Sequence, residues 1–537
     1  MSGDSAGEDV LVAIDVGTSG ARAAAFDLAG RPVAEARRPY PTATPRDGWA
    51  EQHAGHWRRA SIGALAALIR AMQPGRRILA VGLTGQCPTV VPLDAAGRPL
   101  RPAIIYRDNR ATAAAQALRD QFGDSDLHAR TGHVPTAFHL AAKIGWIRAN
   151  EPAVFAAARQ FLEPSEFVAL ALTGEACTDW TTAGASALFD IRRREWAPDL
   201  LAAAGLDSGQ LATVYPSWSV AGELRPALVR RLGLPGPVPV VAGAADSLAC
   251  AFGAGVITPG PVSEMAGSST CLNSVVGSPL SDPDVSMYPS PVLADGYMTE
   301  TGINTAGEAV DWVAALGYAG RNGPPTAADY LKLDREAAAV PAGADGLLFV
   351  PVLGDGERDD PGLRGTAVGL SLRHGRAALA RATFEGLTFG IRRLLEVLGR
   401  DELAITELRV SGQAASLAAW NQIKADVLGI PVRVVPGDAT AAGVAMLAGL
   451  GSGVYGTPAG AVAAACHAGE PVLPDPGNGA RYDELYERYL QVRGSALARA
   501  PSPGDSPVCG SMSLCPMCEQ MASTCITGST APVTRPY

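Results

Sequence analysis

The sequence has very little lysine, no basic tract and no long apolar run. Only three of its 537 residues are lysines and none follows a glycine, so the Gly-Lys-Ser/Thr phosphate-binding loop is excluded. No apolar stretch reaches the roughly 20 residues of a membrane-spanning helix, and residues 1–9 do not form a secretory signal. A net charge of -9 argues against a nucleic-acid or membrane partner held by bulk electrostatics. We therefore expect a cytoplasmic protein.

The length predicts more than one domain. A chain of 537 residues exceeds a single hydrophobic core, and a hydrophobic content of 47% is enough to fill two. Apolar strand-like runs alternate with Ala-rich helical periods up to about residue 240, and a second half of the same α/β kind follows a Pro/Gly-rich stretch. We expect a flexible N-terminus (1–9), an N-terminal domain (10–245), a C-terminal domain (246–495) and a disordered tail (496–537).

The pattern of apolar residues predicts the main elements of both halves. The expected strands are 78–83, 89–93, 103–106, 238–242, 260–265, 347–351, 408–411 and 432–435. The expected helices are 111–122, 141–149, 224–236, 306–316, 376–398, 418–428 and 439–450.

The nine cysteines fall into two groups. Five are scattered through apolar contexts, which is typical of free thiols in a reducing compartment. The other four crowd the tail, at Cys509, Cys515, Cys518 and Cys525. Their spacing fits no common zinc module, so an unstructured extension is favoured over a metal site, and both alternatives stay open.

The segment from Val10 to Asp27 has the pattern of a β-hairpin with an acidic residue at the end of its first strand. Asp15 there can hold Mg²⁺ through water, and the following Gly17, Thr18 and Ser19 can present backbone and hydroxyl donors to a phosphate. An ordinary hairpin with a solvated aspartate is the alternative. A similar turn at Gly267-Ser268-Ser269 indicates duplicated architecture, in which two hairpins grip one nucleotide.

Asp246 follows a second apolar strand and a small-residue turn, at the expected first turn of a helix. The helix dipole favours its ionised form there, so it can accept a hydroxyl proton during phosphoryl transfer. The alternative is a helix cap without catalytic function.

Two further strand ends carry polar residues. Tyr106 to Arg110 combines an aromatic ring with Asp108, and Gln86 follows another strand; such groups suit a polyol or sugar. Either segment is equally compatible with an ordinary loop.

Taken in order, these segments resemble the FGGY family of carbohydrate kinases over roughly residues 10–495, and xylulose kinases most among its members. The family's Asp-x-Gly-Thr-(Ser/Thr) hairpin matches Asp15 to Ser19, its aromatic-x-Asp-x-Arg segment matches Tyr106 to Arg110, and its Gly-x-x-Asp motif matches Gly243 to Asp246. The Leu-Thr-Gly-Glu and Thr-Asp stretch at 172–179 and the 369–386 signature follow the family pattern as well.

The resemblance implies an α/β fold of two ribonuclease-H-like, actin-like ATPase domains with a cleft between them, where Mg²⁺ and ATP bind beside a sugar. It implies that Asp246 is the catalytic base, and that Asp15 and Asp246 hold the metal through water. The implied nucleotide contacts are Thr18, Ser19, Arg22, Gly267, Ser268, Ser269, Gly307, Gly412 and Gln413. The implied sugar contacts are Gln86, Cys87, Tyr106, Asp108 and Asp246.

The chain departs from the family pattern at three places that bear on its ligands. Cys87-Pro88-Thr89 stands where xylulose kinases have Met-His-Gly, Tyr106 replaces the commoner Trp, and Gln413 replaces the second Gly of a pair near the adenosine. We expect a ketopentose kinase of the xylulose type. Glycerol, a tetritol, ribulose or a deoxy-ketose are alternative substrates, a non-catalytic actin-like binding protein is the alternative function, and a homodimer is left open.

Overall fold

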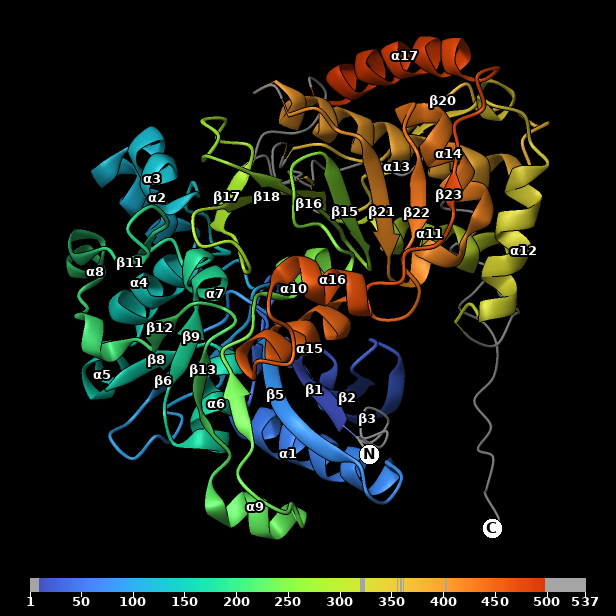
Figure 1. Cartoon of the computed structure of the whole chain (residues 1–537). Helices are drawn as coiled ribbons and strands as arrows, with labels where there is room; N and C mark the ends of the chain where they lie inside the picture. Colours follow the sequence, from blue (N-terminus) through green and yellow to red (C-terminus); the bar gives the residue numbers. More distant parts are fainter. Residues whose placement is uncertain are drawn as a thin grey trace, which may run out of the picture.

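A computed structural model shows the chain folded around two mixed β-sheets (Figure 1). The structure describes residues 9–497, apart from 319–323, 355, 358–359, 361 and 401–402. The four tail cysteines lie outside the described residues. Within the described part, no helix combines the length and apolarity needed to cross a membrane.

The N-terminal sheet has six strands in the order β13-β14-β5-β1-β2-β3. Their bounds are β1 (Asp9–Val16), β2 (Gly20–Asp27), β3 (Pro32–Pro39), β5 (Arg77–Gly85), β13 (Val220–Glu223) and β14 (Pro239–Val241). The hairpin β1–β2 is antiparallel, whereas β5 runs parallel to β1.

The C-terminal sheet has seven strands in the order β17-β18-β16-β15-β21-β22-β23. Their bounds are β15 (Pro261–Ala266), β16 (Thr270–Val276), β17 (Ser286–Pro289), β18 (Tyr297–Ile303), β21 (Glu407–Ser411), β22 (Val432–Val434) and β23 (Pro471–Val472). It repeats the arrangement of the first sheet, because β15–β16 is an antiparallel hairpin and β21 runs parallel to β15. This duplicated architecture confirms the predicted fold class.

Small two-stranded pairs and helices complete the fold. The pairs are formed by β4 (Glu51–Gln52) with β7 (Ala103–Ile104), β6 (Val91–Leu93) with β8 (Gln160–Leu162), β9 (Cys177–Asp179) with β12 (Thr213–Tyr215), β10 (Phe189–Asp190) with β11 (Glu195–Trp196), and β19 (Leu348–Val350) with β20 (Thr366–Val368). The helices of the first half are α1 (Ala54–Ala71), α2 (Thr112–Phe122), α3 (Asp124–Thr131), α4 (Leu140–Asn150), α5 (Pro152–Ala157), α6 (Pro164–Thr173), α7 (Trp180–Gly184), α8 (Pro198–Ala204) and α9 (Pro226–Leu232). The later helices are α10 (Asp246–Gly253), α11 (Ala306–Gly317), α12 (Ala327–Ala338), α13 (Arg376–Gly399), α14 (Ala418–Leu428), α15 (Ala439–Gly451), α16 (Pro458–Ala465) and α17 (Gly479–Leu497).

Strand β1 is buried on both faces, as its continuous apolar sequence predicts. Val12 and Ile14 point into the cluster that contains Trp57 of α1, whereas Leu11 and Ala13 pack in the cluster of Val444 on α15. The alternation of a strand thus supplies both layers of the N-terminal half.

Helices α10 and α15 lie between the two sheets (Figure 1). α15 comes late in the chain yet packs on β1 and β5 of the N-terminal sheet, and α10 contacts both α15 and β15. Glycines allow their backbones to approach closely, because a Cβ at Gly443 of α15 would lie 1.9 Å from the carbonyl oxygen of Ala249 on α10. They place the ends of β1, β14 and β22 around one region of the molecule.

Most expected elements are found within a few residues of their predicted bounds. The helix at 418–428 has the predicted limits, and the hairpins and the strand at 408–411 are in place. The strand predicted at 103–106 instead ends at Ile104, because Ala50 and Arg110 hold Asp108 in a turn. The proposed division at residue 245 stays a prediction.

Candidate active site

The turn of the first hairpin is open to solvent and braced from behind. Asp15 and Arg22 are paired across β1 and β2, and Ser19 at the tip is exposed. Tyr40 donates its hydroxyl to the carbonyl of Gly17 at 2.5 Å, and Gln52 donates to that of Thr18 at 2.7 Å. The carbonyls of the turn therefore face the protein interior, which suits a turn that offers donors outward.

The second hairpin turn is also exposed, and the backbones of two glycines lie against it. A Cβ at Gly307, on the first turn of α11, would lie 2.1 Å from the carbonyl oxygen of Gly267, and Gly412 approaches Ala266 almost as closely. The backbone N–H of Glu308 donates to Ser268 at 3.1 Å. The structure thus brings the predicted nucleotide residues of this half together. The side chain of Gln413 is exposed beside them.

Asp246 is the first residue of α10 and lies immediately after the turn that leaves β14. Its carboxylate accepts a hydrogen bond from the backbone N–H of Ser247 at 2.8 Å and is half-buried. The hydroxyl of Ser247 is in turn bound to Glu300 on β18. A carboxylate at a helix N-terminus, with part of its surface open, can accept a proton from a bound hydroxyl group.

Asp15 and Asp246 lie close enough to influence one another's charge. Burial, and then the negative charges of Asp246 and Asp438, raise the pKa of Asp15 to about 7. The three carboxylates of Asp15, Asp246 and Asp438 together favour a bound cation, because the positive charge of Arg22 offsets only part of their negative charge. Among the described residues, no set of three His, Cys, Asp or Glu side chains forms a complete metal site. A cation held by Asp15 and Asp246 through water, and completed by phosphate oxygens, fits this donor set.

Arg22 is engaged by two carboxylates in this structure. It pairs with Glu35 on β3 and with Asp438, which caps the N-terminus of α15. The predicted phosphate contact of Arg22 therefore stays a prediction. The sequence did not single out Asp438, because only the packing of α15 on the N-terminal sheet brings it here.

Gln86 forms a wall next to the first hairpin and has a free acceptor. Its backbone N–H donates to the carbonyl of Val16 at 3.1 Å, and its Nε2 donates to Gln52 Oε1 at 2.7 Å. Gln86 is 4% exposed, and its Oε1 atom has no hydrogen-bond partner among the residues that the structure describes. Gln52, which also accepts from Trp57, was missed by the sequence reasoning because it belongs to no motif.

Tyr106 connects the two predicted subsites. Its hydroxyl accepts a bond of 3.4 Å from the hydroxyl of Thr18, and its ring packs edge-on against Phe138 at 6.3 Å. Asp108, by contrast, is fully buried: Arg110 donates to both of its oxygens and Ala50 N–H to one of them. Its direct contact with a sugar stays a prediction, because this ion pair occupies the carboxylate.

A buried lysine lies beneath the segment where the chain departs from the family pattern. Lys143 on α4 has no exposed surface, and its Nζ donates to the carbonyls of Pro88 and Phe138. Burial lowers the pKa of Lys143 to about 7, against the opposing charges of Glu163 and Asp108. Burial also raises the pKa of the Cys87 thiol well above its ordinary value. Cys87 therefore remains a neutral, half-buried wall residue rather than a thiolate nucleophile.

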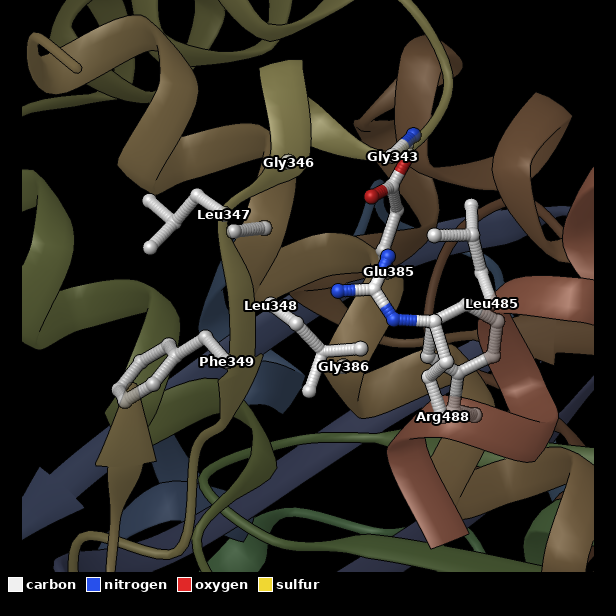
Figure 2. Close-up of a pocket in the computed structure, with 11 residues that line it drawn as sticks. Gly343, Gly346, Leu347, Leu348, Phe349, Glu385, Gly386, Leu485 and Arg488 are labelled. Atoms are coloured by element: carbon white, nitrogen blue, oxygen red, sulfur yellow. Dashed lines mark hydrogen bonds between the residues drawn. The ribbon is translucent and has the colours of Figure 1, made fainter. Parts of the chain in front are cut away.

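The C-terminal half also contains a hollow that none of the site residues described above lines (Figure 2). It lies between β19, α13 and α17, and Glu385 at its edge accepts from Gly343 N–H at 2.9 Å. Leu348, Phe349 and Leu485 are among its apolar lining residues. It contains no residue of either hairpin and not Asp246, so it is separate from the candidate site.

Two domain models of one protein family match this chain. Residues 10–253 match the N-terminal domain of the FGGY family of carbohydrate kinases, and residues 263–452 match its C-terminal domain. The chain belongs to the FGGY family. It is therefore a carbohydrate kinase, which transfers a phosphoryl group from ATP to an alcohol group.

Relatives of this FGGY kinase are named after different substrates, xylulose and glycerol among them. The solved structure of a xylulose kinase from Rhodospirillum rubrum is 32% identical in sequence and has a TM-score of 0.83. The match spans 90% of this chain and 98% of that kinase. A glycerol kinase of Bordetella pertussis is 32% identical over 473 residues, which are 83% of this chain and 89% of the relative. A xylulose kinase of Lactococcus lactis subsp. lactis is 27% identical over 495 residues, which are 90% and 96% of the two chains.

Proposed function

We propose that this FGGY kinase phosphorylates a ketopentose of the xylulose type, with Asp246 as the general base. The observation that carries the proposal is the placement of Asp246 at the start of α10, near enough to Asp15 to raise its pKa. The charge of Asp246 acts on Asp15 of the first hairpin and raises the pKa of Cys87, the residue after Gln86, so this base lies near both the proposed phosphate turn and the proposed acceptor wall.

In the proposed reaction, Asp246 takes the proton of the acceptor hydroxyl as the hydroxyl oxygen bonds to the γ-phosphorus of ATP. The bond from that phosphorus to the bridging oxygen breaks, and ADP leaves with the electron pair. Because the transition state of phosphoryl transfer is loose, positioning and charge stabilisation supply most of the catalysis. Thr18, Ser19, Ser268 and Ser269 would hold the phosphates from two sides.

Asp15 and Asp246 would hold Mg²⁺ through water, and the ion supplies positive charge for the phosphate oxygens when it is bound. Gly307 and Gly412 would border the nucleotide. The backbone of Gly307 lies so close to the second hairpin that a residue with a side chain would not fit there.

The acceptor side rests on Gln86, Cys87 and Tyr106. The free Oε1 of Gln86 can accept a hydrogen bond from a sugar hydroxyl, and the ring of Tyr106 offers an apolar wall. The xylulose kinase of Lactococcus lactis subsp. lactis matches 90% of this chain, whereas the glycerol kinase of Bordetella pertussis matches 83%. Glycerol is the second candidate, since that glycerol kinase is 32% identical.

The test measures ADP release with Mg²⁺ and ATP across a panel of ketoses, aldoses and polyols that includes xylulose, ribulose, glycerol and erythritol. Turnover that depends on the acceptor, with the largest kcat/KM for xylulose, supports the proposal. A larger kcat/KM for glycerol would replace the ketopentose by a polyol. No acceptor-dependent turnover would favour a binding protein.

A further inference from the structure

The Thr-Asp segment at 178–179 belongs to a buried hydroxyl network that has no part in the chemistry described so far. Asp179 ends β9 and caps α7, and it is 2% exposed. Its carboxylate accepts from the hydroxyls of Thr181 at 2.5 Å, Thr182 at 2.6 Å and Ser217 at 2.9 Å, and from the backbone N–H of Thr181 at 2.7 Å. The backbone N–H of Thr182 is a fifth donor, at 3.4 Å. A buried carboxylate with five donors is a fixed acceptor.

Two of these partners continue to the turn before the catalytic base. The hydroxyl oxygen of Thr181 accepts the backbone N–H of Ala245 at 2.8 Å, and the carbonyl of Ser217 accepts that of Gly243 at 2.9 Å. A hydroxyl has one hydrogen, and that of Thr181 is directed at Asp179. Its lone pairs are thereby oriented toward Ala245, the residue that precedes Asp246.

Beyond these two bonds, the turn at 243–245 is held mainly by packing, since Ala244 and Ala245 are buried in the core. Its side chains are those of Gly and Ala, and Ala245, at the N-cap of α10, makes no side-chain capping bond. The remaining backbone N–H of the turn, that of Ala244, donates to the carbonyl of Leu83 over a longer distance, 3.3 Å. The carbonyl of Ala245 accepts from Ala249 N–H within α10 at 2.9 Å, so the bond to Thr181 is what ties the residue before Asp246 to a side chain outside the helix.

We propose that Thr181, oriented by Asp179, is a positioning residue that sets the place of the Asp246 carboxylate relative to the acceptor hydroxyl. The proposal rests on the proposed function, since it assigns no chemistry to Thr181 itself. Loss of the bond leaves a buried N–H unpaired and frees the first turn of α10 to shift. A shift of about 1 Å at a reacting group costs about 100-fold in rate.

Thr182 provides a matched control. Its hydroxyl donates to the same carboxylate and it is 4% exposed, but within the described residues it makes no hydrogen bond to the 243–245 turn. Thr181→Val and Thr182→Val therefore each remove one hydroxyl from Asp179 with little change in volume. Only Thr181→Val removes the acceptor of Ala245.

The experiment compares kcat, the KM values for ATP and for the acceptor, and the melting temperature of wild type, both Val variants and Thr181→Ser. We expect Thr181→Val to lower kcat about 10-fold to 100-fold with the KM for ATP nearly unchanged, Thr182→Val to keep kcat within about threefold, and Thr181→Ser to restore kcat. If Thr181→Val does not fold, Thr181→Ala replaces it with the same expectations. Equal kcat values for the two Val variants, or no rescue by Ser, would overturn the proposal. A wild type without acceptor-dependent turnover would instead contradict the proposed function.

Discussion

Arg22 on β2 and Asp438 at the start of α15 form an ion pair, although 416 positions separate them in the sequence. The same Asp438 carboxylate caps α15 by accepting from Ala441 N–H at 2.9 Å. The Asp438 side chain thus connects the N-terminus of α15 to the first hairpin.

This double role separates two variants of Asp438. Asn caps helices as well as Asp but carries no charge, whereas Ala neither caps nor pairs. We expect Asp438→Ala to lower the free energy of unfolding by about 1 kcal/mol more than Asp438→Asn does. Urea unfolding of both variants measures the difference. Equal losses would show that the cap contributes nothing.

The turn that carries Asp246 needs glycine at position 243. Gly243 has a φ of +85°, and a Cβ there would lie 1.6 Å from the carbonyl oxygen of Leu83. We expect Gly243→Ala to lower the free energy of unfolding by about 2 kcal/mol or more and to reduce kcat. Gly236→Ala, at a position with open space around it, is the control and leaves both unchanged. A Gly243→Ala enzyme with normal kcat would contradict this account of the turn.

The acceptor wall gives a prediction in KM. Gln86→Leu removes both the free Oε1 and the bond to Gln52, so we expect the KM for the acceptor to rise about 10-fold or more. The KM for ATP should change little, because the side chain of Gln86 donates to Gln52 Oε1 and to the carbonyl of Gly17, groups that are not the donors offered to a phosphate. Steady-state kinetics with each substrate varied in turn distinguishes the two. A rise confined to the KM for ATP would assign Gln86 to the nucleotide.

Lys143 predicts a dependence of stability on pH. Since the folded pKa, about 7, lies below the ordinary value of 10.5, the unfolded chain holds a proton between these values that the folded chain lacks. The free energy of unfolding therefore rises with pH in this window, by at most about 1.4 kcal/mol per pH unit, and the contribution is lost as pH falls to 7.

Lys143→Met removes that contribution, so its stability should rise less steeply between pH 7 and 10 than that of wild type. Glu163 and Asp108 act on the same amine and oppose the effect of burial. Lys332→Met, an exposed lysine on α12, should follow the wild-type curve. Parallel curves for Lys143→Met and wild type would show that the buried amine keeps its proton.

The local parts of the fold were predictable from the sequence. The hairpins at Asp15 and Gly267, the helix at 418–428 and the strand at 408–411 have strong periodicity or distinct turn residues, and all are present. Their order also identified the family, because collinear motifs over most of a chain are specific even where each motif alone is weak.

Contacts between distant segments were not predictable. Asp438 and Gln52 reach the site only because α15 packs on the first sheet and β4 pairs with β7. The bond from Ala50 N–H to the Asp108 carboxylate likewise joins positions 58 residues apart and could not be predicted from the motif around Asp108. Periodicity reports which face of an element is buried and carries no information on which partner covers it.

The rate of phosphoryl transfer by Asp246→Asn tests the central claim most directly. The variant keeps the size of the side chain and an acceptor for Ser247 N–H, but it cannot take a proton. We predict a kcat about 100-fold to 10,000-fold below that of wild type on the best acceptor of the panel, with ATP binding by calorimetry retained. A kcat within a few-fold of wild type would contradict the assignment of Asp246 as the base.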